Sequence, residues 1–183
     1  FVRERDQNDQ ALAEKVRSVD TLSLSTSSAS ATGMMEHSES RIVPYTADLM
    51  FSVVADVERY PEFLPWVVAL RVKSRQAEGG RDILLAEMAV GYRALRERYT
   101  SRVTLDPAAR TIDVVAIDGP FHKLENHWRF TPEGTMTRTE FKVAFEFSNR
   151  LLQKAAGAAF EKVLLKMTDA FEARAASLSQ SEA

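Results

Sequence analysis

The sequence predicts an α+β fold in which a curved antiparallel sheet of seven strands wraps around one long C-terminal helix, with a short helical segment after the first strand. Between residues 66 and 147, apolar and polar residues alternate in runs typical of strands with one buried face. Glycine and proline turn signals separate these runs. From residue 149 to about Ser177 the apolar spacing changes to that of an amphipathic helix.

A strand and a helical segment begin the fold. A short alternating run over residues 39–44 predicts the first strand, and Thr46 is a suitable N-cap for a helix that continues through Val57. Pro61 then disfavours a helical conformation at Tyr60, so we expect a sharp turn. Four large side chains gather at this bend, either as core or as the rim of an apolar cavity: Tyr60, Phe63, Leu64 and Trp66. Their place in a turn favours the rim of a portal.

Six further strands follow, each ended by a hairpin signal such as Gly79-Gly80 or Asp118-Gly119-Pro120. They are expected at residues 66–74, 82–90, 94–105, 111–117, 124–130 and 135–147. Alternation places Leu95, Glu97, Tyr99, Ser101, Val103 and Leu105 on one face of the third of these strands. It likewise groups Leu124, Asn126, Trp128 and Phe130 on a later strand. One face of the sheet is therefore dry and the other solvated.

The last element is a long helix, capped by Ser148 or Asn149 and about 43 Å long at the standard rise per residue. It can cover the dry face by itself, which makes the whole a helix-grip arrangement. Its first half contains Ala155-Ala156-Gly157-Ala158-Ala159. Such small side chains either draw the helix close to the sheet or leave a cavity, and both remain open. Gly157 is costly inside a helix and indicates close approach of backbone or ligand.

Length and composition indicate one domain with extensions. A chain of 183 residues with 45% hydrophobic residues can bury one sizeable core. We expect residues 36–178 to form this domain. Residues 1–35, with a serine-rich linker composition, are expected to be a disordered or partly helical extension, and residues 179–183 a short tail.

Several functional classes are excluded or disfavoured. The chain has no cysteine, which excludes disulfides and thiolate metal sites. A net charge of -2 provides no global field for nucleic acid, so we expect no DNA partner. Because the sequence has neither an apolar run of membrane-spanning length nor a secretory signal, we expect a cytoplasmic protein, at most peripheral to the inner membrane.

Three segments resemble a known family. They are Asp-Val-Glu-Arg-Tyr-Pro-Glu-Phe-Leu-Pro-Trp at residues 56–66, Asp-Gly-Pro-Phe at 118–121 followed by Leu124 and Trp-Arg-Phe at 128–130, and Phe-Glu-Phe at 145–147. These segments resemble the START-like coenzyme Q-binding proteins, grouped with polyketide cyclase/dehydrase-like sequences, a family that includes a ribosome-association toxin branch. The likeness covers about residues 36 to 178.

The resemblance implies a START/Bet v 1-like helix-grip fold with a deep hydrophobic tunnel for ubiquinone or a polyprenyl lipid. It implies a carrier that supports respiratory electron transport, with no catalytic residues and no cofactor besides the lipid ligand. Ligand-binding residues are then expected at Tyr60, Phe63, Leu64, Trp66, Leu95, Tyr99, Val103, Phe121, Leu124, Trp128, Phe141, Val143, Phe145, Leu152, Ala155, Ala159 and Val163. Donors to a quinone head group are expected among Tyr60, Trp66, Tyr99 and Lys123.

Two rival functions stay open. A cyclase- or dehydratase-like enzyme needs an inward acid, and Glu87 and Glu97 would supply it unless a one-residue register slip exposes them. A ribosome-binding inhibitor would use the arginines on the wet face, whose alternative is an ordinary solvated strand. These arginines are Arg93, Arg96, Arg98 and Arg102.

The histidines predict no metal site. His37 falls where the N-terminal extension meets the domain, and we expect surface histidines. His122 and His127 are five residues apart, which places them on opposite faces of a strand.

Overall fold

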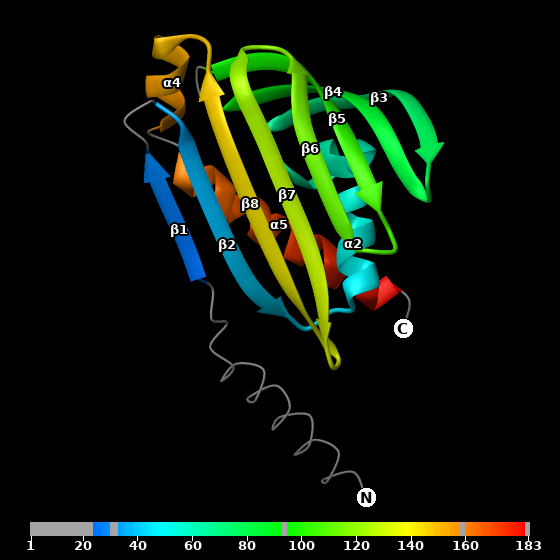
Figure 1. Ribbon diagram of the computed structural model, residues 1–183. Coiled ribbons are helices and arrows are strands. Elements are labelled where there is room, and N and C mark those ends of the chain that lie inside the picture. Colours follow the sequence, from blue (N-terminus) through cyan, green and yellow to red (C-terminus); the bar gives the residue numbers. More distant parts are fainter. Residues whose placement is uncertain (1–23, 30–32, 93–94, 158–159, 182–183) are drawn as a thin grey trace, which may run out of the picture.

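A computed structural model describes residues 24–29, 33–92, 95–157 and 160–181 (Figure 1). The strands are β1 (Leu24–Ala29), β2 (Met35–Val43), β3 (Val67–Glu78), β4 (Arg81–Tyr92), β5 (Leu95–Asp106), β6 (Thr111–Asp118), β7 (Phe121–Glu133) and β8 (Met136–Phe147). The helices are α2 (Ala47–Ala55), the 3-10 turn η1 (Val57–Arg59), α3 (Tyr60–Phe63), α4 (Arg150–Gly157) and α5 (Phe160–Ser181).

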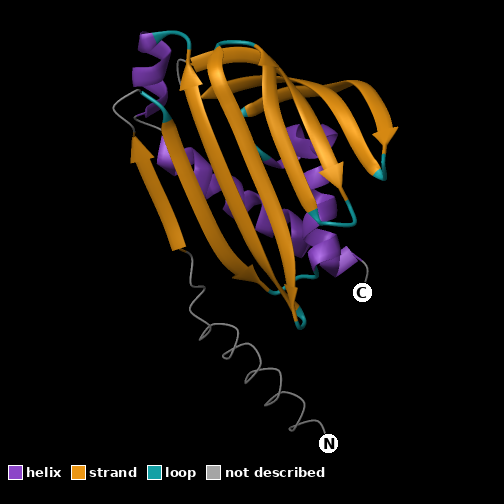
Figure 2. Ribbon diagram, viewed as in Figure 1, coloured by secondary structure: helices purple, strands orange, loops and turns teal. Residues whose placement is uncertain are grey.

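Within these residues, eight strands form one sheet in the order β1-β2-β8-β7-β6-β5-β4-β3, and every neighbouring pair is antiparallel. The sheet curves, and α5 and α2 lie on the same side of it (Figure 2). The predicted faces are confirmed, since Val103 and Leu105 are buried whereas Arg96 and Arg98 are exposed. The expected α+β helix-grip fold is therefore confirmed.

The expected strand number was one too low. All six residues of β1 are exposed, so this strand is held to β2 by backbone pairing and carries no apolar alternation that would reveal it. Strand β2 also begins earlier than the predicted residue 39. Its inward positions include the polar His37 and Glu39, which hide the alternation in the sequence.

The first helix begins as predicted. The Thr46 side chain accepts a hydrogen bond from the backbone N–H of Leu49 at 3.2 Å. The expected extended conformation of Tyr60 is wrong, because Tyr60 opens the short helix α3 with φ -52° and ψ -39°. Proline is tolerated in the first turn of a helix, where its missing N–H has no partner to lose.

The long C-terminal element is described as two helices, with residues 158 and 159 between them outside the described part of the chain. The Asn149 side chain accepts from the backbone N–H of Leu151 at 2.7 Å and so caps the start of α4. A Cβ atom added to Gly157 would meet Met35 at 3.6 Å, which is ordinary contact. The close approach expected at this glycine is therefore absent among the described residues.

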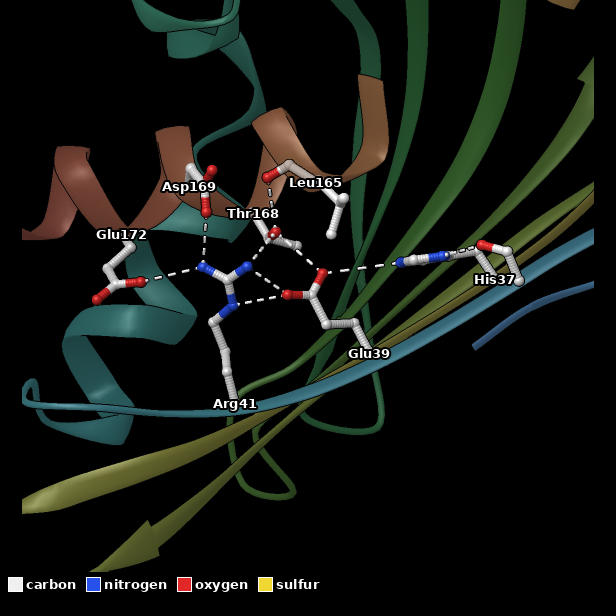
Figure 3. Close-up of polar contacts among 8 residues, drawn as sticks. His37, Glu39, Arg41, Leu165, Thr168, Asp169 and Glu172 are labelled. Atoms are coloured by element: carbon white, nitrogen blue, oxygen red, sulfur yellow. Dashed lines mark hydrogen bonds and ion pairs between the residues drawn. The ribbon is translucent and has the colours of Figure 1, made fainter. Parts of the chain in front are cut away.

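A polar cluster, buried at the strand and open to solvent at its far end, joins β2 to α5 (Figure 3). We call it the β2–α5 clamp and define it by His37, Glu39, Arg41, Thr168, Asp169 and Glu172. The Arg41 guanidinium donates to Glu39, to the Thr168 hydroxyl at 2.9 Å, and on its other side to Asp169 and Glu172. Burial alone would lower the pKa of Arg41, but these carboxylates raise it above its usual value.

His37 belongs to the interior, and the expectation of a surface histidine was wrong for this residue. It is only 2% exposed. Its Nδ1 lies 2.7 Å from the Ser27 hydroxyl of β1, and its Nε2 lies 3.7 Å from the Glu39 carboxylate. His37 thereby links the edge strand to the clamp.

Candidate functional site: an apolar cavity between sheet and helix

A cavity of about 210 Å³ lies between the sheet and α5. Strands β3 to β7 form its walls, and η1 and α3 contribute at the bend. Its lining is Val57, Tyr60, Leu64, Trp66, Val67, Leu70, Ala86, Met88, Val90, Tyr99, Ser101, Val103, Ile112, Val114, Asn126, Trp128, Val163, Leu164, Met167 and Phe171. Most of these side chains are apolar, which suits a hydrophobic ligand.

The structure brings only part of the expected site together. The expected residues that line the cavity are Tyr60, Leu64, Trp66, Tyr99, Val103, Trp128 and Val163. Those that lie away from it are Phe63, Leu95, Phe121, Leu124, Phe141, Val143, Phe145, Leu152 and Ala155. Ala155 is exposed, and Ala159 lies outside the described residues.

Aromatic packing explains why the cavity does not extend under β8. The Phe141 ring lies 4.3 Å from Trp128, and Phe145 lies 4.6 Å from Phe160, centroid to centroid. These contacts fill that half of the interior. Open space remains where the strands carry smaller side chains such as Ala86 and Ser101. Of the alanine-rich segment, the described residues Ala155, Ala156 and Gly157 do not line the cavity.

Several lining residues were missed by the sequence reasoning. They include Ala86, Met88, Ile112, Val114, Leu164, Met167 and Phe171, together with the polar Ser101 and Asn126. The strand alternation already placed Ser101 between Tyr99 and Val103 on the dry face, so that signal was present.

Three of the expected head-group donors, Tyr60, Lys123 and Tyr99, already have partners within the protein. The Tyr60 hydroxyl already donates to the backbone carbonyl of Val54, and its ring packs 5.2 Å from Phe171. Lys123 forms an ion pair with Glu125 at 3.1 Å and does not line the cavity. The Tyr99 hydroxyl lies 3.3 Å from the Met88 sulfur, a weak acceptor that a ligand can replace.

Gly119 allows the turn between β6 and β7 to pack against Tyr99. Its φ is +130°, and a Cβ atom added there would lie 2.4 Å from the Tyr99 Cβ. A side chain at this position therefore requires the backbone to shift. The glycine of the Asp118-Gly119-Pro120 signal thus helps hold a cavity residue in place.

Alkaline pH should destabilise the protein through Tyr99, because burial raises the pKa of this phenol to about 12. An unfolded tyrosine has a pKa of about 10, so the contribution is intact below pH 10 and is lost as the pH rises to 12. At pH 11 the loss is about 1.4 kcal/mol. Tyr99→Phe should lose that much less stability than wild type between pH 9 and pH 11 in urea titrations. Parallel pH profiles of the two proteins would contradict this role of Tyr99.

The two acids expected for enzymatic chemistry do not form a pair in the cavity. Of the two alternatives left open for Glu87, the structure shows the outward one: this residue binds Lys73 at 2.7 Å and Arg98 at 2.9 Å, and these cations lower its pKa. Apolar residues occupy both faces of β4, so alternation could not choose between them. Glu97 shares the face of Tyr99 but does not line the cavity.

Within the described residues, no group of three histidine or acidic side chains is arranged to hold a metal ion. His122 is exposed, and His127 pairs with Asp113 at 2.6 Å. On the wet face, Arg96 and Arg102 are exposed and Arg98 is paired with Glu87, whereas Arg93 lies outside the described residues.

Comparison with known families identifies the family to which the chain belongs. Residues 43–172 match the family described as polyketide cyclase/dehydrase and lipid transport. The chain belongs to this family. The family resemblance expected from the three sequence segments is thereby confirmed.

None of the helices in the described ranges is long and apolar enough to span a bilayer.

Two similar proteins of this kind carry different names. The ribosome association toxin RatA of Rickettsia prowazekii is 36% identical over 145 residues, covering 78% of this chain and 97% of the toxin. The mitochondrial coenzyme Q-binding protein COQ10 homolog B of Xenopus laevis is 34% identical over 147 residues, covering 77% of this chain and 58% of that protein.

Solved structures support the fold. The 18 kDa protein CC1736 of Caulobacter crescentus superposes with a TM-score of 0.68 at 40% identity, covering 79% of this chain and 98% of that one. The Zhui aromatase/cyclase of Streptomyces has a TM-score of 0.67 at 20% identity, over 78% of this chain and 93% of the enzyme. At that identity the enzyme shows a shared fold alone.

Proposed function

We propose that this protein binds ubiquinone or a polyprenyl precursor in the cavity and supports its delivery or use in respiratory electron transport, as a carrier and not as an enzyme. The observation that carries the proposal is the apolar cavity of about 210 Å³ under the sheet. The lipid transport family and the relative named for coenzyme Q binding support it.

The cavity volume limits what is enclosed. Typical small-molecule sites have about 300 to 1,000 Å³, so this cavity has room for one substituted ring or a short stretch of tail. A longer polyprenyl tail would leave past the half-buried side chains of the lining, which include Trp66, Val90 and Val163. Burial of one isoprene unit is worth roughly 3 to 4 kcal/mol before ordering costs. Apolar contact is therefore sufficient for affinity.

The experiment is to purify the protein from a ubiquinone-producing host, extract it with organic solvent, and analyse the extract for quinone by absorbance and mass spectrometry. We expect quinone or polyprenyl lipid at a substantial fraction of the protein concentration. The proposal would be contradicted if the extract contained no lipid and the protein did not bind added ubiquinone.

Ribosome association is the second candidate, because the RatA toxin matches along 97% of its length whereas the coenzyme Q-binding relative matches along 58%. The outward arginines Arg96 and Arg98 of β5 are the surface to test. Co-sedimentation with large ribosomal subunits that is lost in Arg96→Glu/Arg98→Glu would support this candidate. Absence of the wild-type protein from the ribosomal fractions would dismiss it.

A further inference from the structure

The apolar cavity contains two polar atoms without a partner. The Ser101 hydroxyl oxygen and the Asn126 side-chain Oδ1 are both inaccessible to solvent and, within the described residues, make no hydrogen bond. Both residues line the cavity, and Ser101 is only 4% exposed. Because nearly all buried polar atoms in proteins are hydrogen-bonded, two such exceptions in one cavity need an explanation.

The two residues lie on the same wall of the cavity, with strand β6 between them. Ser101 is on β5 and Asn126 on β7, with Val114 of β6 paired directly to Asn126. Tyr99 lies two residues before Ser101 on the same face of β5, a separation of about 7 Å along a strand. Its hydroxyl donates to the Met88 sulfur at 3.3 Å, and sulfur is a weak acceptor. Three residues that carry polar groups, Tyr99, Ser101 and Asn126, therefore line an otherwise apolar space.

The chemistry of the unpartnered atoms defines the missing partner. A carbonyl-type oxygen such as Asn126 Oδ1 accepts hydrogen bonds and needs a donor. A serine hydroxyl both donates and accepts. A ring that bears hydroxyl groups supplies a donor to Asn126 and either role to Ser101. An oxidised quinone has carbonyl acceptors alone and leaves Asn126 Oδ1 unsatisfied.

We infer that Ser101 and Asn126 form a polar subsite that binds a hydroxylated ring, and that the protein prefers the hydroquinone form of its ligand to the quinone form. This inference rests on the proposed function, because it assigns the head group of the lipid that the cavity is proposed to bind. The apolar remainder of the cavity surrounds the rest of the ring and its substituents.

The test measures binding of three probes to the full chain: ubiquinone with one isoprene unit, the same molecule reduced to its hydroquinone, and 1-methylnaphthalene, which has no polar atom. We expect the hydroquinone to bind about 10-fold more tightly than the quinone, which corresponds to about 1.4 kcal/mol. Ser101→Ala and Asn126→Leu should each weaken hydroquinone binding by about 3- to 10-fold and leave the hydrocarbon unchanged.

Thr139 provides the matched control. Its hydroxyl is also buried without a partner, but Thr139 does not line the cavity. Thr139→Val should leave the binding of all three probes unchanged. Without ligand, Ser101→Ala and Thr139→Val should both raise the melting temperature, by about 2 to 4 °C, because each removes an unsatisfied buried hydroxyl.

The outcomes separate the two proposals. In one outcome the hydrocarbon binds while quinone and hydroquinone bind with equal affinity, and in another it binds while Ser101→Ala and Asn126→Leu have no effect. Either result overturns the polar subsite and leaves the proposed carrier function intact. Failure of all three probes to bind overturns both. A fall in melting temperature for Ser101→Ala shows that its hydroxyl supports the fold, and this result also overturns the subsite.

Discussion

Arg41→Leu should lower the free energy of unfolding by about 3 to 5 kcal/mol, because it leaves the Glu39 carboxylate buried without its cation. The Glu39 side chain is 1% exposed and that of Arg41 is 11% exposed. Removing one partner of such a pair is costly because the remaining charge cannot reach water. A domain is typically stable by about 5 to 15 kcal/mol, so this single change removes much of the total. Urea denaturation measures the effect.

Two control proteins make the result specific to burial. Arg98→Leu removes an ion pair with Glu87 in which the arginine side chain is 66% exposed, and it should cost less than about 1 kcal/mol. The double variant Glu39→Leu/Arg41→Leu removes both buried charges and should recover most of the lost stability. If Arg41→Leu costs no more than Arg98→Leu, the clamp does not stabilise the docking of α5 on β2.

Ala86→Phe should abolish lipid binding while the protein remains folded. Ala86 is buried in β4 and lines the cavity, so a phenyl ring at this position occupies the space that a ligand needs. The cavity of about 210 Å³ receives the ring, so the stability cost should stay below about 1.5 kcal/mol. Loss of the apolar contact of one isoprene unit corresponds to a drop in affinity of about 100-fold or more. Titration with ubiquinone and circular dichroism measure both quantities.

Ala89→Phe is the matched control for this prediction. Ala89 is on the same strand, an odd number of residues away from Ala86, and therefore lies on the opposite face. It does not line the cavity, so its substitution should leave lipid binding unchanged. Equal binding by wild type and Ala86→Phe would show that the lipid does not occupy this cavity. Ala86→Phe also bears on ribosome association, which should be insensitive to it if the outward arginines make the contact.

Cavity and clamp together give α5 two distinct faces. Thr168, Asp169 and Glu172 hold it to β2 through Arg41. Val163 and Met167 face the cavity. The helix is therefore fixed along one side by charge and hydrogen bonds while the other side borders incompletely filled space. This arrangement allows a cavity to persist without loss of the packing that keeps the helix in place.

The sequence by itself determined the elements whose signals are local. The Thr46 cap, the hairpin turn at Asp118-Gly119-Pro120 and the two faces of β5 depend on residues a few positions apart, and each agrees with the structure. The three family segments likewise pointed to the family that the chain belongs to.

Tertiary structure alone decided the position of the cavity, the pairing of β1 and the burial of His37 and Glu39. Strand β4 carries apolar residues on both faces, so only its packing against β3 and β5 placed Glu87 outside and Ala86 inside. His37 and Glu39 are buried because their partners come from β1 and from Arg41 and α5. The space beneath the sheet depends on which distant rings meet, as Trp128 of β7 does with Phe171 of α5. Such contacts join residues far apart in the chain. The spacing of apolar residues within one strand or helix therefore does not predict them.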